Sequence, residues 1–119
     1  MGVVIAVLAA AMCLTASPVS GHAYVETSSP SDAATVGPPR EVMVRFTEKV
    51  ELEFSTVVVK SQTGEAMNAG KVRQPAPDTL AVDLKTLPPG TYVIEWRVLS
   101  IDTHVTSGAM KFTVAAPRR

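Results

Sequence analysis

The chain has 119 residues, of which eleven are Lys or Arg and eleven are Asp or Glu, so its formal net charge is zero. This length is enough for one domain and too short for two. No basic run stands out, and the two arginines at the C-terminus are too few for a nucleic-acid-binding surface, so we expect no nucleic-acid partner.

The first 21 residues, "MGVVIAVLAAAMCLTASPVSG", contain no charged side chain and are largely apolar. The apolar run has the length of a signal-peptide core and is shorter than the roughly 20 residues that a membrane-spanning helix needs. Val19 and Gly21 suit cleavage after Gly21, although a cut after Ala23 fits the same rule. We predict a signal peptide over residues 1–21 and an exported domain over residues 22–119. The alternative is an uncleaved N-terminal anchor, because no Lys or Arg precedes the apolar run.

The single cysteine, Cys13, lies within the predicted leader. Met12 precedes it, whereas a lipoprotein signal has a small residue at that position. We therefore expect this cysteine to be lost on processing. The mature domain then has no thiol, which excludes disulfides and thiolate metal sites.

Short runs rich in β-forming residues follow one another through the mature chain. They are "AYVETS" (23–28), "EVMVRF" (41–46), "STVVVKS" (55–61), "GKVRQ" (70–74), "TLAVDL" (79–84), "GTYVIEWRVLS" (90–100) and "GAMKFTV" (108–114). Between them, "SPSDAATVGPP", "QTGEAMN", "PAPD" and "LPPG" are rich in turn residues. No stretch shows ten residues of helical periodicity without a breaker. About seven strands in this length predict an all-β domain, a Greek-key β-sandwich or barrel.

Alternating apolar residues mark the strand faces that we expect to be buried. Trp96 alternates with charged neighbours, and we assign it to the core rather than to ligand stacking. Aromatic residues are few, so the core must rest mainly on Val, Leu, Ile and Ala. The clearest alternating sets are Val42, Val44, Phe46 and Met110, Phe112, Val114.

The chain contains two histidines, His22 and His104. After cleavage behind Gly21, His22 offers its α-amine and its Nδ1, which together close a six-membered chelate ring on a metal. The amine has a pKa of about 7.7–8.0, so a metal displaces its proton at neutral pH. An imidazole from His104 brings the count to three nitrogens in a T-shaped plane, which suits tetragonal Cu(II). Asp102 stands two residues before His104, on the same side of an extended segment, so its carboxylate can join or orient the site.

Each of these residues also has an ordinary explanation. A lone loop histidine such as His104 is more often solvated than bound to a metal. Asp102 can brace a turn through its own backbone. The position of His22 behind the leader can be chance. From the residues alone, a copper site and a metal-free surface both remain open.

Three motifs span the mature chain: a His before a strand that ends in "SSP", "FTE" after "EVMVR", and "W-R-V-x-S-x-D-x-H-x-x-x-G". With these motifs the sequence resembles the CopC family of periplasmic copper-resistance proteins. The resemblance implies a cupredoxin-like β-barrel that binds one Cu(II) per chain, through His22 and His104. It implies that Asp102 is a ligand or close partner, and that Glu48, from "FTE", lies near the copper and accepts a hydrogen bond from the amine. It also favours cleavage after Gly21, because a cut after Ala23 would discard His22.

The resemblance also implies a function. We expect a monomeric periplasmic carrier or buffer of copper, not an enzyme, with an inner-membrane transporter of the CopD type as acceptor. Some family members hold Cu(I) on a Met-rich loop, but the corresponding segment here offers Met67 alone, so we expect no such second site. The alternatives are an oxidative enzyme built on a histidine brace, and a metal-free adhesion or assembly β-sandwich.

Overall fold

The computed structural model describes residues 22–117, so the predicted signal peptide, residues 1–21, lies outside the described residues. Eight strands and one short 3₁₀ turn make up this part of the chain. They are β1 (Val25–Ser29), β2 (Thr35–Val36), β3 (Glu41–Phe46), η1 (Leu52–Phe54), β4 (Thr56–Ser61), β5 (Arg73–Ala76), β6 (Thr79–Asp83), β7 (Gly90–Leu99) and β8 (Val105–Val114). Among the described residues, no helix is long and apolar enough to cross a membrane.

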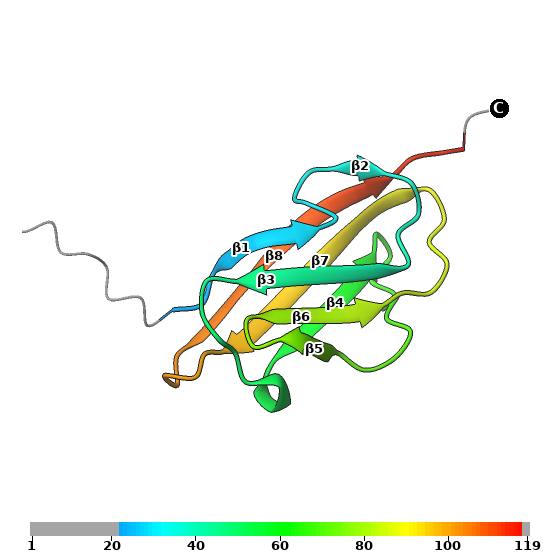
Figure 1. Cartoon of the computed structure of the whole chain (residues 1–119). Coiled ribbons are helices and arrows are strands. Elements are labelled where there is room, and N and C mark those ends of the chain that lie inside the picture. Colours follow the sequence, from blue (N-terminus) through cyan, green and yellow to red (C-terminus); the bar gives the residue numbers. More distant parts are fainter. Residues whose placement is uncertain (1–21, 118–119) are drawn as a thin grey trace, which may run out of the picture.

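The strands form two four-stranded sheets that pack face to face (Figure 1). One sheet has the order β1-β3-β6-β5 and the other the order β2-β8-β7-β4. Of the described strands, only β5–β6 and β7–β8 are chain neighbours that also pair with each other, so the remaining connections cross between the sheets. This crossing pattern is typical of Greek-key sandwiches. The predicted all-β sandwich is confirmed.

All seven predicted strands are present, with ends shifted by up to a few residues. The additional strand β2 lies in "SPSDAATVGPP", whose composition predicts turns, and it pairs in parallel with β8. A two-residue strand is too short to show alternation, and its pairing partner is far away in sequence. The second difference is that β8 begins at Val105 rather than at residue 108, which shortens the polar loop after β7.

The predicted inward faces form the core between the two sheets. Both alternating sets of three residues are buried, and the core is built mainly from Val, with Leu, Ile and Ala. Trp96 is 7% exposed, as expected for a core residue, and its indole meets the ring of Phe46 edge to face at 5.4 Å. Such aromatic pairs add about 0.5–1.5 kcal/mol to the burial of their area.

The β7–β8 hairpin positions the last motif. Its strands pair continuously from Gly90↔Val114 to Leu99↔Val105, which leaves residues 100–104 as the connecting turn. Figure 1 shows this turn at the same end of the molecule as the start of β1. The hairpin therefore brings the "S-x-D-x-H" part of the motif close to the beginning of the described chain.

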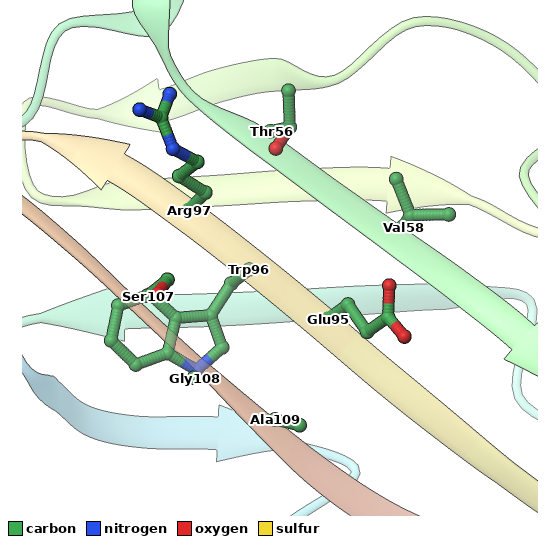
Figure 2. A pocket seen from close by; sticks show the side chains of 8 residues that line it. All are labelled: Thr56, Val58, Glu95, Trp96, Arg97, Ser107, Gly108 and Ala109. Carbon is green, nitrogen blue, oxygen red and sulfur yellow. The ribbon is translucent and has the colours of Figure 1, made fainter.

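The register of this hairpin also explains the Trp and the Gly of the motif. Trp96 pairs directly with Gly108, and the indole lies over the glycine (Figure 2). A Cβ at position 108 would stand 2.6 Å from Cζ2 of the indole, which is closer than real Cβ contacts come. The glycine is needed because a side chain would occupy the space of the ring.

We expect Gly108→Ala to destabilise the fold by about 1–3 kcal/mol, because the added carbon must displace the buried indole of Trp96. Chemical denaturation of the two proteins measures the difference. Ser107→Ala is the matched control, because Ser107 is the exposed neighbour on the same strand. This substitution should change the free energy of unfolding by no more than about 0.5 kcal/mol. A Gly108→Ala protein as stable as the parent would show that the indole has room to move.

Candidate metal centre

The two residues that follow His22 are held in place by hydrogen bonds. Ala23 is fully buried, and its carbonyl accepts a hydrogen bond of 2.5 Å from the hydroxyl of Thr106 on β8. The main-chain N–H of Tyr24 donates to Thr47 Oγ1 at 3.0 Å, and the N–H of Thr47 donates back to the Tyr24 carbonyl at 2.8 Å. These bonds hold the first described residues against both sheets, while the His22 side chain itself is exposed.

The turn that carries His104 is closed by its own main chain. The N–H of Ser100 donates to the His104 carbonyl at 2.9 Å, and the N–H of Thr103 donates to the Ser100 carbonyl at 2.9 Å. Thr103 adopts a φ of 73°, in the left-handed region that a tight turn requires. A further bond from the N–H of Ile101 to the carbonyl of Lys49 ties the turn to the segment after β3.

The two imidazoles face each other at this end of the sandwich. Their ring centroids are 4.8 Å apart and their planes are inclined by 41°. A metal–imidazole bond is about 2 Å long, so two rings that share one ion have centroids about 4 to 6.5 Å apart. The spacing of His22 and His104 therefore fits one ion held between them, reached directly from solvent.

Asp102 lies beside His104 within the turn. Its Oδ1 is 3.3 Å from His104 Nδ1 and also accepts a hydrogen bond from the hydroxyl of Ser100. The bond from Ser100 is the main cause that lowers the pKa of the Asp102 carboxyl; partial burial opposes the shift and His104 adds to it. Asp102 is thus a carboxylate at neutral pH. With His104 Nδ1 turned towards it, Nε2 is the ring nitrogen that is left to bind an ion.

Glu48 lies in the bend after β3 and is half-buried. It follows Thr47, whose main chain pairs with Tyr24, so the segment of Glu48 runs beside the segment of His22. In the described part of the chain, no hydrogen bond or ion pair joins Glu48 to His22 or His104.

The side chains of residues 22–117 include no group of three His, Cys, Asp or Glu residues arranged to hold a metal ion. The predicted site draws its third nitrogen from elsewhere, namely the α-amine of His22. That atom is a free amine only when His22 begins the chain. In the predicted site, the two facing imidazoles would be the side-chain part, and the remaining nitrogen donor would come from the main chain.

Apolar side chains are exposed in the segments that carry the two histidines and in η1. The segment of η1 adjoins the end of β7 through a 2.8 Å bond from the N–H of Glu51 to the carbonyl of Leu99. Tyr24 stands next to the His22 ring at a centroid distance of 6.3 Å. We call the exposed large apolar side chains of the described residues the apolar rim, which consists of Tyr24, Leu52, Phe54, Ile101 and Val105.

A hollow on the face of one sheet is separate from this site. It has a volume of about 550 Å³ and lies over β4, β7 and β8 (Figure 2). None of the four predicted site residues lines it. One of its charged residues, Glu95, forms an ion pair of 2.9 Å with Lys60 on the neighbouring strand.

Two residues near the histidines do not belong to the site predicted from the sequence. Ser100 is 1% exposed and binds Asp102 from inside the fold, and Thr47 anchors the segment behind His22. The sequence carries a signal for Ser100, since a hydroxyl two residues before an aspartate stands on the same side of an extended chain. Thr47 gives no such signal, because its partner is distant in sequence.

Known proteins provide a comparison for this arrangement. The family model of the CopC domain matches residues 25–115. Copper resistance protein C of Xanthomonas campestris pv. juglandis is 34% identical over 116 residues, which cover 91% of either chain. Copper transport protein CutJ of Bacillus subtilis (strain 168) is 31% identical over 97 residues, which cover 78% of this chain and 18% of that protein.

A solved structure agrees with the sequence matches. The crystal structure of CopC from Methylosinus trichosporium OB3b superimposes with a TM-score of 0.73 at 33% sequence identity, covering 78% of this chain and 93% of that one. The match in fold, the match to the family model and the relatives in copper resistance and transport lead to the same assignment. The chain belongs to the CopC family of copper-binding proteins.

Proposed function

We propose that the mature chain begins at His22 and carries one Cu(II) in the periplasm. The observation that supports this most directly is the pair of imidazoles at 4.8 Å, one of them held by a carboxylate. Both rings are exposed, so an ion can enter and leave without opening the fold. This accessibility suits a protein that accepts copper and passes it on.

In this proposal the α-amine and Nδ1 of His22 and Nε2 of His104 bind the ion as three nitrogens in one plane. Tetragonal Cu(II) prefers such nitrogen donors with oxygen donors beside them. Asp102 supports His104, and Glu48 accepts a hydrogen bond from the amine. The pairing between Thr47 and Tyr24 supports the role of Glu48, since it keeps the two segments adjacent.

A carrier is favoured over an oxidative enzyme by the surroundings of the site. Two carboxylates near the copper would take up the positions that an oxidant needs. Enzymes that use a histidine brace on polymers also need a broad aromatic surface, and this chain has one Trp, two Tyr and three Phe. Trp96, Tyr92, Phe46 and Phe112 are buried in the core, which leaves few aromatic side chains for a substrate.

The acceptor in this proposal is an inner-membrane copper transporter of the CopD type, met by a monomeric carrier. The relative CutJ supports this, because the matched part is a small fraction of a longer copper transport protein. The apolar rim supports it as well. Its members Tyr24, Ile101 and Val105 lie in the segments that carry the two histidines, and exposed apolar side chains close to a site suit a surface that another protein covers.

The proposal predicts that the protein starting at His22 binds one equivalent of Cu(II) tightly and Cu(I) weakly. A soft ion needs several sulfur ligands, and Met67 and Met110 are both buried in the core. Titration followed by electron paramagnetic resonance gives the stoichiometry and the number of coupled nitrogens, which should be three. Failure to bind one equivalent of Cu(II) would favour the metal-free sandwich, and a tight Cu(I) equivalent would reveal a sulfur site that we do not expect.

A further inference from the structure

Ser100 is a buried polar residue directly beneath the exposed turn that carries His104. It follows the last residue of β7 and is 1% exposed. Its hydroxyl donates to Asp102 Oδ1, and its oxygen lies 3.3 Å from the main-chain nitrogen of His104. The carbonyl of His104 is also near, at 3.2 Å. One interior hydroxyl thus reaches both of the turn residues that belong to the proposed site.

A hydroxyl has a single proton, and its best acceptor here is the charged carboxylate of Asp102. The lone pairs of the oxygen then accept from the N–H of His104. The same carboxylate oxygen of Asp102 lies 3.3 Å from Nδ1 of His104, within reach of an N–H on that nitrogen. Ser100, Asp102 and His104 therefore form a chain of hydrogen bonds that runs from the core to the imidazole.

We propose that Ser100 is a positioning residue for the copper site: its hydroxyl fixes the carboxylate of Asp102, which in turn fixes the His104 ring with Nε2 towards the ion. This proposal rests on the proposed function. The side chains of Asp102 and His104 are 44% and 53% exposed, so neither is held by packing. The anchor must come from a buried group, and Ser100 supplies it.

Two main-chain bonds of the turn do not involve this hydroxyl. The bonds from the Ser100 N–H to His104 and from the Thr103 N–H to Ser100 close the turn through backbone atoms alone. Replacing Ser100 by Ala keeps those two bonds, and it removes the hold on the carboxylate together with the acceptor of the His104 N–H. The hydroxyl thus serves the orientation of the side chains that follow it.

The test uses the chain starting at His22, with Ser100→Ala, Asp102→Asn and the double variant, and Ser107→Ala as a control on the same hairpin. Partners of a metal ligand typically change affinity by about 10–100-fold, so Ser100→Ala should weaken Cu(II) binding by about 10-fold. Because Ser100 acts through Asp102, Ser100→Ala should have little further effect in the Asp102→Asn background. Independent, additive losses would overturn the positioning role.

A measurement on the copper-free protein keeps the test decisive even if Ser100→Ala folds poorly. The ¹⁵N shifts of the neutral His104 ring report which nitrogen carries the proton, and the parent should hold it on Nδ1. Asp102→Asn and Ser100→Ala should both give a mixture of tautomers, while Ser107→Ala should not. An unchanged tautomer in Asp102→Asn would overturn the chain of hydrogen bonds itself.

Cu(II) binding by His104→Ala separates this proposal from the proposed function. If His104→Ala leaves Cu(II) binding intact, the proposed copper site fails. If His104→Ala abolishes binding while Ser100→Ala behaves like Ser107→Ala, only the role of Ser100 fails.

Discussion

An acetyl group joined to the amine of His22 should lower the affinity for Cu(II) by more than the roughly 10–100-fold that an outer partner contributes, because it removes a ligand. The primary amine becomes an amide nitrogen, whose lone pair is delocalised into the acetyl carbonyl, and no other free amine is left beside the imidazole. The chelate ring of His22 is lost, although every side chain is retained. We expect the spectrum of bound Cu(II) to lose one coupled nitrogen.

The stability of the copper-free fold should not change with this modification. The bonds that fix the start of the domain involve Ala23 and Tyr24, and the added acetyl group lies ahead of both. A matched control is prepared by the same route but keeps the free amine, and it should bind Cu(II) like the parent. Thermal unfolding of the copper-free proteins gives the stability comparison. Unchanged affinity and an unchanged spectrum in the acetylated protein would mean that the amine is not a ligand.

Replacing His104 by Ala should weaken Cu(II) binding at least as much as blocking the amine of His22, because the second imidazole is then lost. The side chain is 53% exposed, and the bonds that close the turn use main-chain atoms of residues 100 to 104. Stability of the copper-free protein should therefore change by no more than about 0.5 kcal/mol. Competition with a chelator of known affinity measures the loss of binding.

Ile101→Ala is the matched control for this variant. Ile101 is an exposed residue of the same turn, 54% accessible, and its side chain belongs to the apolar rim rather than to the metal-binding groups. Its loss should leave Cu(II) affinity unchanged. If His104→Ala and Ile101→Ala bind copper equally well, His104 is a surface histidine and the proposed site is wrong.

The local pattern of residues was enough to predict the sandwich. Alternation in "EVMVRF" and "GAMKFTV" identified strand faces that the structure buries, because side chains on a strand point to opposite faces with a period of two. Turn-rich segments marked the crossings between sheets. Strand β2 escaped prediction because its two residues pair with β8, and only the packed sheet defines that partner.

The chemistry of the proposed site follows from residue type and position in the chain. A histidine behind a predicted leader can offer an amine and an imidazole together once cleavage exposes it, and the absence of cysteine from residues 22–119 leaves nitrogen and oxygen donors. Those conclusions need no fold. They follow from the pKa of an α-amine and from the ligand preference of Cu(II).

Tertiary structure alone decided which of these groups meet. The register of β7 against β8 sets residues 100–104 as a turn, and the bond between Thr106 and Ala23 brings that turn to His22. Long-range pairing of this kind depends on many distributed contacts, so no local pattern encodes the 4.8 Å between the imidazoles. For Ser100, the sequence places its hydroxyl on the same side as Asp102, but only the packed sheets bury it, and burial makes the hydroxyl an anchor.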